Sequence, residues 1–332
     1  MKKVTILGLT DTASSLISGP ADIFRNAGHL WNFIFKKPEV SYFDIEIVSP
    51  DGQPIKCGGN LTINAHSSID CVQETDLLII PSIKDIEETM TKEKQVIPWI
   101  KKTYEHGAHV AAICTGTFVL AETGLLDGKV ATTHWGFIES FRQRYPNVKL
   151  KPERLITESG NIFTSGGSNA CYDISLYLVR RYCGNDVARK LAKAFLHDLD
   201  RVSQAPWIEF QGQRAHSDKE IRNAQERLEN QYIDSFNFDR VAQDFGMSRR
   251  TFERRFKATT GDSPLQYLQR VRVEAAKRIL ENENKSFDEV TYAVGYEDPG
   301  FFRKIFTQIS GISPKEYRIK WGTPVNFSMP LK

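Results

Sequence analysis

Short apolar runs alternate with longer amphipathic patterns through the first half of the chain. Four runs, rich in β-branched residues, end in Gly, Ser-Pro, Pro or Cys: Val4–Leu9, Phe43–Val48, Leu77–Ile80 and Val110–Ile113. Between them, Lys92–His106 and Thr117–Thr123 carry apolar residues at helical spacing. Fully apolar short strands separated by helices are typical of βαβ units with a parallel sheet covered on both faces. The pattern therefore predicts a doubly wound, mainly parallel α/β domain.

The pattern continues in the same style toward the middle of the chain. Two more strands are expected at Arg154–Glu158 and Asn161–Thr164, joined by a hairpin turn at Ser159-Gly160. Ser168–Arg181 and Asn185–Leu199 follow as helices. The fold class expected for this part is flavodoxin-like α/β.

The last third of the chain contains two similar copies of one sequence pattern. Phe238, Val241 and Gly246 return 49 positions later as Phe287, Val290 and Gly295. After one inserted residue the next matches return 50 positions later: Phe252, Phe256, Gly261, Ser263, Pro264 and Tyr267 become Phe302, Phe306, Gly311, Ser313, Pro314 and Tyr317. Agreement at so many apolar and turn positions indicates a duplicated small helical unit.

Each copy consists of a short helix, a glycine turn and a capped second helix. Ser248 and Asp298 are good N-caps for the two second helices, and Ser286 with Glu289 makes a capping box at the start of copy two. Helix, glycine turn, helix is the helix-turn-helix signature. The second part of the chain is therefore expected to be all-α, with two such units.

Between the two parts the periodic pattern lapses, from Val202 to Asp218, and Pro206 and Gly212 interrupt it. The domains predicted are residues 1–200, a linker at 201–217, the helical domain at 218–322 and a C-terminal tail at 323–332.

Composition excludes several classes of protein. No window reaches a transmembrane length, and the basic start Met1–Lys3 is followed by too short an apolar run for a signal peptide, so we expect a cytoplasmic protein. Five irregularly spaced cysteines with no C-x-x-C pair predict free thiols and no metal; no cofactor is expected. The net charge of +3 is too small to indicate nucleic-acid binding, so that inference must rest on local charge.

Local charge gathers on the second helix of each copy. In copy one Phe252 and Phe256 are four apart and must face the core, which leaves other faces to Arg249, Arg250, Glu253, Arg254 and Lys257. In copy two Arg303 and Lys304 are left exposed in the same way. These arginines can form a merely solvated helix face. The duplication favours DNA instead, because two equivalent helices joined by the long helix Pro264–Glu281 can enter successive major grooves about 34 Å apart.

Residues Ala224–Lys320 resemble the AraC-type DNA-binding domain. The motifs that carry the resemblance are SRRTFERRFKATTGDSPLQYLQRVRVEAAKRIL in copy one and GYEDPGFFRKIFTQISGISPKEYR in copy two. The resemblance places base-reading positions at Arg250, Glu253 and Arg254 and, in copy two, at Pro299, Gly300, Arg303 and Lys304. Neither Pro299 nor Gly300 has a side chain that can hydrogen-bond a base edge. We therefore expect copy one to discriminate between sequences and copy two to anchor phosphates.

A cysteine ends the last buried strand of the first part. The predicted strand reaches Ile113, Cys114 follows, and Gly116 permits a tight turn into a helix. Such an elbow presents a side chain at the carboxyl edge of the sheet, where the helix N-terminus favours a thiolate, and His134 in TTHW can return to the same edge. Equally, a cysteine at the end of an apolar strand can be a small buried hydrophobe and a lone histidine can be structural.

Residues 1 to about 200 resemble the ThiJ/PfpI superfamily, through AAICTG as its nucleophile elbow and TTHW as its histidine segment. The resemblance implies a partner carboxylate in the loop after the first strand, where this chain has Leu16. It also implies a Gly-Gly after the third strand, where this chain has Pro81-Ser82-Ile83. We therefore expect a binding pocket and not an enzyme, with candidate pocket residues Cys114, Thr115, His134, Trp135 and Asp173.

The order of the two parts resembles that of a group of bacterial transcription regulators. The resemblance implies a first domain that senses a small effector, such as an amino-acid derivative or a quaternary amine, and forms a homodimer, and a second domain that binds double-stranded DNA. Two alternatives stay open: a cysteine-dependent hydrolase or amidase fused to a DNA-binding module, and a scaffold whose first domain only dimerises.

Overall fold

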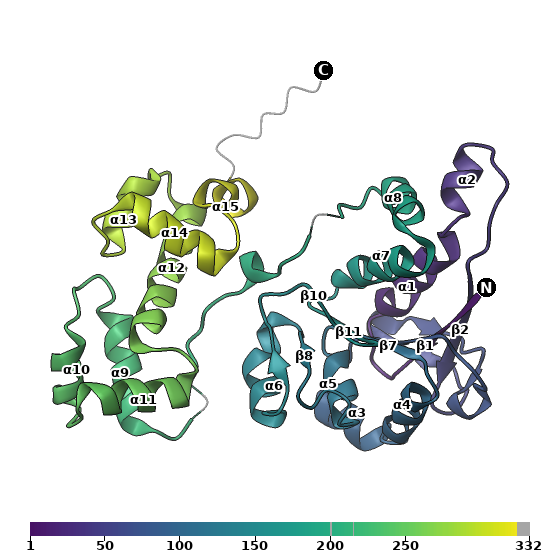
Figure 1. The fold of residues 1–332 in the computed structure, drawn as a ribbon, viewed down its shortest axis with the longest axis horizontal. Helices are drawn as coiled ribbons and strands as arrows, with labels where there is room; N and C mark the ends of the chain where they lie inside the picture. The colour runs from purple at the N-terminus through teal and green to yellow at the C-terminus, as the bar shows by residue number, and fades with distance from the viewer. Residues whose placement is uncertain (200, 215, 324–332) are drawn as a thin grey trace. The chain divides into compact units, whose positions relative to one another are not determined.

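The computed structural model describes residues 1–199, 201–214 and 216–323, and the chain divides into two compact units, Met1–Gln204 and Ala205–Lys332 (Figure 1). The tail predicted at 323–332 lies, from residue 324 onward, outside the described residues.

A mixed, mainly parallel sheet forms the centre of the first unit. Its seven strands run in the order β10-β11-β7-β6-β1-β2-β5, and β10 alone is antiparallel to its neighbour. The strands are β1 Lys2–Leu7, β2 Phe43–Ser49, β5 Ser67–Ser68, β6 Leu77–Ile80, β7 His109–Ile113, β10 Ile156–Ser159 and β11 Ile162–Ser165. This confirms the predicted α/β fold class, including the hairpin at Ser159-Gly160, where Gly160 takes a positive φ of 66°.

Helices cover both faces of this sheet because successive strand residues point to opposite faces. Leu77 and Ile79 of β6 belong to the core beneath α1 (Ser15–Asn26), α7 (Ala170–Cys183) and α8 (Asn185–Ala194). Leu78 and Ile80 belong to the opposite core, beneath α3 (Ile86–Lys92), α4 (Val96–Glu105), α5 (Gly116–Glu122) and α6 (Ile138–Arg144). The short helix α2 (Leu30–Ile34) and two small strand pairs, β3 (Ile55–Lys56) with β4 (Thr62–Ile63) and β8 (Val130–Ala131) with β9 (Lys149–Leu150), complete the unit.

Two of the predicted helices are wrong at one end. Helix α4 begins at Val96 and not at Lys92, because Lys92 ends α3 and the Glu93 side chain accepts a hydrogen bond from the Thr10 amide at 3.0 Å. Helix α8 ends at Ala194 and not at Leu199, because Leu196 takes a left-handed φ of 53° that no helix continues through.

The second unit is helical and contains the repeat. Its helices are α9 Lys219–Asn230, α10 Phe238–Asp244, α11 Arg249–Thr260, α12 Pro264–Asn282, α13 Phe287–Ala293, α14 Pro299–Ser310 and α15 Pro314–Trp321. Copy one has its own core around Phe252 and Phe256, and copy two has another around Phe302 and Phe306. Helix α12 contributes to both, with Tyr267 and Leu268 in the first and Val273, Ala276 and Leu280 in the second.

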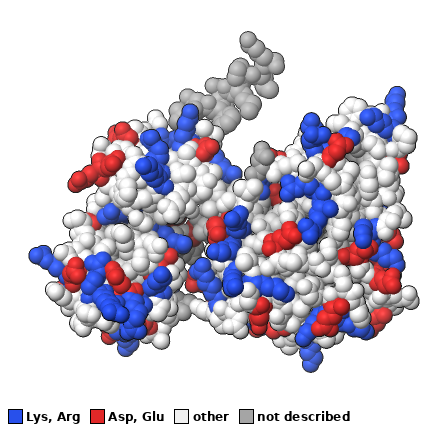
Figure 2. Space-filling model, viewed as in Figure 1, with Lys and Arg blue, Asp and Glu red and all other residues white. Residues whose placement is uncertain are grey.

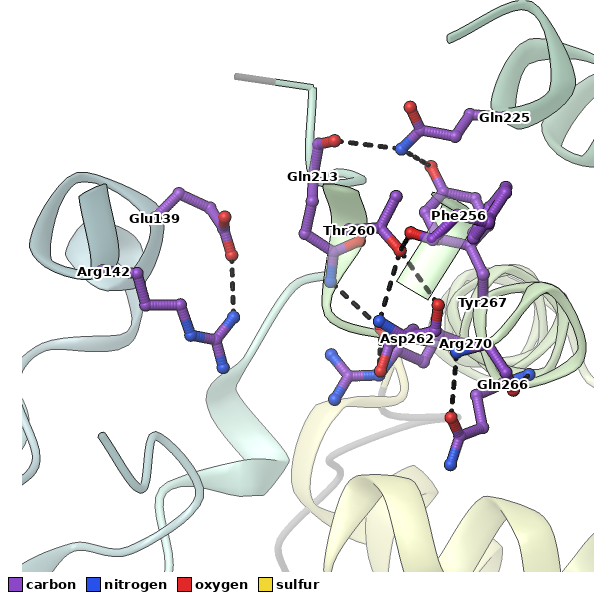
Figure 3. A network of polar contacts seen from close by, with 11 residues as sticks. Glu139, Arg142, Gln213, Gln225, Phe256, Thr260, Asp262, Gln266, Tyr267 and Arg270 are labelled. Carbon is purple, nitrogen blue, oxygen red and sulfur yellow. Dashed lines mark hydrogen bonds and ion pairs between the residues drawn. The ribbon is translucent and has the colours of Figure 1, made fainter. Parts of the chain in front are cut away.

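Residues 201–217, predicted as a linker, are distributed between the two units. Ser203 and Gln204 bind the Glu153 carbonyl within the first unit, at 2.7 and 3.0 Å. Beyond Ala205 the segment packs on the second unit, where the buried Lys277 ammonium donates to the Ile208 carbonyl at 2.6 Å. Figure 3 shows Gln213 there: its side-chain amide donates to Asp262, and its main-chain carbonyl accepts from the Gln225 side chain.

Candidate DNA interface and cysteine elbow

The two helix-turn-helix units are built alike. In copy one Gly246 (φ 67°) makes the turn after α10, and the Ser248 hydroxyl caps α11 by accepting from the Thr251 amide. In copy two Gly295 (φ 82°) makes the turn, and the Asp298 carboxylate caps α14 through two amides. The predicted caps, and the capping box of Ser286 with Glu289, are confirmed.

The predicted basic residues of α11 fall into two groups. Arg250, Arg254 and Lys257 are exposed, and the structure gives them no ion pair with any described residue. Arg249 instead pairs with Glu253 at 2.5 Å and with Asp239 at 3.5 Å, and lies over the Phe238 ring at 5.2 Å. Two arginines and one lysine of this helix are therefore available for DNA, whereas Arg249 and Glu253 already hold each other.

Arg255, which the sequence analysis did not single out, is a structural residue of the same helix. Its guanidinium makes two hydrogen bonds to Asp218 at 2.6 and 2.8 Å and one to Glu220 at 2.8 Å. Since Asp218 caps α9, Arg255 ties α11 to the start of α9. Figure 2 shows basic side chains, with acidic ones among them, over the part of this unit that α10 and α11 form.

Helix α14 offers a different surface. Gly300, Arg303 and Lys304 are exposed and Pro299 is partly so, and Arg303 lies over the Phe287 ring at 5.3 Å. Sequence reasoning missed Phe301, an aromatic residue in the first turn of this helix that is 53% exposed. The signal was available: Phe301 and Phe302 are adjacent, and on a helix two adjacent residues cannot both face the core.

The cysteine elbow is present at the carboxyl end of β7. Cys114 takes a positive φ of 57°, which is a strained backbone conformation for a residue with a side chain. The residue is buried, with 4% of its surface exposed. Position 116 requires glycine, because a Cβ there would lie 2.3 Å from the Pro81 carbonyl oxygen. The Thr115 hydroxyl fixes the neighbouring loop by donating to the Ile83 carbonyl at 2.5 Å and accepting from its amide at 3.0 Å.

Burial favours the protonated form of the thiol in this elbow. Burial raises the pKa of Cys114 above its ordinary value, although hydrogen bonds from groups that include Ser82 and Ser168 act in the opposite direction. A thiolate is the nucleophilic species, so burial works against nucleophilic use of this cysteine.

His134 lies on the segment next to the elbow. Its Nδ1 accepts from the Gly136 amide at 3.0 Å, its ring stacks on Trp135 at 5.4 Å, and burial lowers its pKa. The structure gives no hydrogen bond between His134 and Cys114 in the described chain; the connection runs through Thr133, whose hydroxyl donates to the Cys114 carbonyl at 2.9 Å.

Asp173 has partners of its own. Its buried carboxylate pairs with His197 and with Arg201, each at 3.2 Å, and burial is the largest effect on its pKa, which is raised. It lines a cavity of 220 Å³ that it shares with Tyr177 and Arg180 and to which none of the other candidate pocket residues contributes. The structure thus gathers Cys114, Thr115, His134 and Trp135 along one edge and directs Asp173 to a separate cavity.

The structure shows what occupies the two positions at which this chain departs from the superfamily pattern. Leu16 is buried in the first turn of α1, in the same apolar core as Cys114. The Ser82 hydroxyl oxygen lies 3.2 Å from the Thr115 hydroxyl oxygen. Glu93, missed from the sequence, brings a buried carboxylate to the loop after β1 by accepting from the Thr10 amide; the contacts of the described residues do not join it to Cys114.

Comparison with known proteins decides the family. Residues 2–181 match the DJ-1/PfpI family and residues 241–320 match a helix-turn-helix domain. The chain is an AraC-family regulator with an N-terminal DJ-1/PfpI domain. The arrangement expected from the two resemblances is confirmed.

Transcriptional regulators are among its relatives. The HTH-type transcriptional regulator CdhR of Pseudomonas aeruginosa is 26% identical over 273 residues, which cover 82% of this chain and 80% of that protein. GbdR of the same organism is 27% identical, covering 82% of this chain and 73% of that protein. The isonitrile hydratase of Pseudomonas putida, an enzyme, is 27% identical over 174 residues, which cover 52% of this chain and 68% of that protein.

One solved structure supports the fold of the first unit. A protein described as a transcriptional regulator, from Vibrio parahaemolyticus, matches with a TM-score of 0.51 and 27% identity, covering 59% of this chain and all but 2% of that chain. Among the residues described here, the longest helices are too short or too polar to cross a bilayer.

Proposed function

We propose that this AraC-family regulator is ligand-responsive and sequence-specific, and acts as a cytoplasmic homodimer. The observation that carries the DNA-binding part is the pair of capped second helices, α11 and α14. They share one connecting helix and expose cations that form no ion pair with a described residue. In this proposal each helix enters a major groove, and α12, which contributes to both cores, sets their separation.

The first unit is proposed to bind a small amino-acid derivative or amine at the edge that holds Cys114, Thr115, His134 and Trp135. Two features support a binding site over a catalytic one: burial raises the pKa of the Cys114 thiol, and Leu16 is apolar where the superfamily places a carboxylate. A ligand that binds two arrangements of the dimer with different affinity changes how the DNA-binding units are presented.

Selection from a random DNA library tests the DNA-binding part. The expected result is a consensus whose protected segments lie about one helical turn apart on one face of the duplex. Binding that is equal on selected and random DNA would contradict sequence-specific recognition. Sedimentation of the full chain tests the dimer, and a thermal-shift screen with amino acids and quaternary amines tests the effector; a screen in which no compound shifts Tm favours the scaffold.

A second candidate, a cysteine-dependent hydrolase or amidase, is favoured by one observation: the positive φ of Cys114, a strained elbow of the kind that presents a nucleophile. Cys114→Ser separates the two. Regulation that persists in this variant excludes a nucleophilic requirement, whereas turnover of a substrate that the variant abolishes supports the enzyme.

A further inference from the structure

Gln204 is the last residue of the first unit, and its side chain is turned back into that unit. The residue is 3% exposed. Its amide nitrogen donates to the Thr133 carbonyl at 2.8 Å, the Thr132 hydroxyl at 3.1 Å and the Arg154 carbonyl at 3.3 Å. The residue that follows, Ala205, belongs to the second unit. The end of the first unit is thus attached by a buried amide to the segment that precedes His134.

This attachment closes a circuit of contacts around the cysteine elbow. The Thr133 hydroxyl donates to the Cys114 carbonyl at 2.9 Å, and the Cys114 amide donates to the Ser165 carbonyl at 3.0 Å. Gly166 comes next, and a Cβ there would lie 2.5 Å from Oε1 of Gln204. Cys114 is therefore held between two segments, and Gln204 touches both of them.

The main chain beside Gln204 depends on the same region. The Gln204 amide donates to the Glu153 carbonyl at 3.0 Å, and the Leu155 amide donates to the Val202 carbonyl at 3.2 Å. The Thr132 hydroxyl also donates to the Arg154 carbonyl, at 2.9 Å. Residues 132–133 and residues 202–204 therefore both bind the segment 153–155.

The attachment is only half satisfied. Oε1 of Gln204 is buried and has no hydrogen-bond partner among the described residues. A buried acceptor without a donor costs free energy, so an amide in this position contributes less to stability than its three donated bonds suggest. Breaking a contact of this kind costs little free energy, and a reversible connection requires such a contact.

We propose that Gln204 is a positioning residue that couples the Cys114 edge to the junction between the units, so that displacement of the Thr132–His134 segment by a ligand releases residues 202–204. The inference rests on the proposed ligand-binding function and supplies its route to the second unit. The coupling is reciprocal, because linked equilibria must be: loosening Gln204 also loosens the elbow.

The first test uses the full chain and the isosteric variant Gln204→Glu, which replaces the donating amide by an acceptor against two carbonyl oxygens. Alkylation of Cys114 by iodoacetamide, followed at the level of its peptide, should accelerate about tenfold, the effect of one lost buried hydrogen bond. Gln213→Glu is the matched control, since Gln213 is a buried glutamine of the same 201–217 segment whose contacts lie in the second unit. It should leave Cys114 alkylation within about twofold of the wild type.

The second test runs in the opposite direction. Thr133→Val removes the hydroxyl that holds the Cys114 carbonyl, and hydrogen exchange at the Gln204 and Leu155 amides should accelerate by about fivefold or more if the circuit is coupled. The Gly8 amide, which donates to the Val48 carbonyl at 2.7 Å between β1 and β2, reports general loosening of the unit and should not change. If the two sites are coupled, the rate increase in the double variant should be larger than either single increase but smaller than the product of the two.

Unchanged exchange at Gln204 in Thr133→Val, or unchanged Cys114 alkylation in Gln204→Glu, would overturn the coupling. Equal acceleration at Gly8 would also overturn it, by reducing Gln204 to a stabilising residue. These outcomes are separate from the proposed function, because DNA selection and the ligand screen can succeed while the coupling fails.

Discussion

The two helix-turn-helix units share their interior and differ on their surface. Phe252 and Phe256 of copy one have the same place as Phe302 and Phe306 of copy two, fully buried against α12. Both copies bury a tyrosine that donates to a glutamate of an earlier helix, Tyr267 to Glu229 and Tyr317 to Glu281. The interior preserves the way in which the helices pack.

The surfaces show what can vary once that interior is in place. Helix α11 presents arginines able to make bidentate contacts to guanine. Helix α14 begins with proline and glycine and presents an aromatic ring beside Lys304. We therefore expect the same scaffold to read bases by hydrogen bonding in copy one and to make phosphate and methyl contacts in copy two.

The largest expected effect is on the α11 side. Arg254→Ala should weaken binding to the selected DNA by about 1–3 kcal/mol and relax the preference at one base pair, because a bidentate contact to guanine is lost. Titrations on matched and single-substituted duplexes measure this. Equal losses on selected and random DNA would show a phosphate contact and remove the contrast between the copies.

The shared interior can be tested by removing one hydroxyl from each copy. Tyr267→Phe should lower the free energy of unfolding by about 2 kcal/mol, since its hydroxyl binds Glu229 and also accepts from Gln225 at 3.2 Å. Tyr317→Phe should lower the free energy of unfolding by about 1 kcal/mol, since the Tyr317 hydroxyl donates to Glu281. Urea unfolding, with hydrogen exchange along α12, gives both values; the reverse order would contradict the packing described.

Phe301 should contribute a smaller, methyl-specific term. An apolar ring in the major groove contacts the thymine C5 methyl group, so replacing the contacted thymine by deoxyuracil should cost the wild type about 0.8 kcal/mol, or about fourfold in Kd. Phe301→Ala should lose this sensitivity. Scanning each thymine of the α14 half-site finds the position, and sensitivity that persists in Phe301→Ala assigns the methyl contact to another residue.

Lys304 should give the smallest effect on specificity. Lys304→Ala is expected to weaken binding equally on all sequences and to reduce the slope of log K against log salt by about one. Binding measured over a range of salt concentrations checks this. A changed sequence preference in this variant would instead make α14 a hydrogen-bonding reader like α11.

Sequence patterns predicted the parts of the molecule that local chemistry determines. Caps at Ser248, Asp298 and Ser286 and the hairpin at Gly160 follow from side chains within a few residues, and the structure confirms them. The end of α8 at Ala194 was missed because nothing local in the sequence requires the left-handed backbone at Leu196.

Tertiary partners, by contrast, could not be predicted. Asp173 was grouped with Cys114 as a candidate pocket residue, but the structure pairs its carboxylate with His197 and Arg201, more than twenty residues away. Gln204 was assigned to a linker because a polar residue after a broken pattern has no local sign of burial. Its contacts come from Thr132 and Thr133, some seventy positions earlier.

Helix α12 has one more consequence. Its 19 residues extend about 28 Å at 1.5 Å per residue and belong to both cores, so the two recognition helices cannot rotate independently. B-DNA repeats about every 10.5 base pairs. Two recognition helices joined by one connecting helix should therefore be sensitive to the rotation between their half-sites as well as to the distance between them. Overwinding or underwinding the duplex moves one half-site out of phase with its helix. We therefore expect the affinity of this protein for its promoter to depend on the torsional state of the DNA.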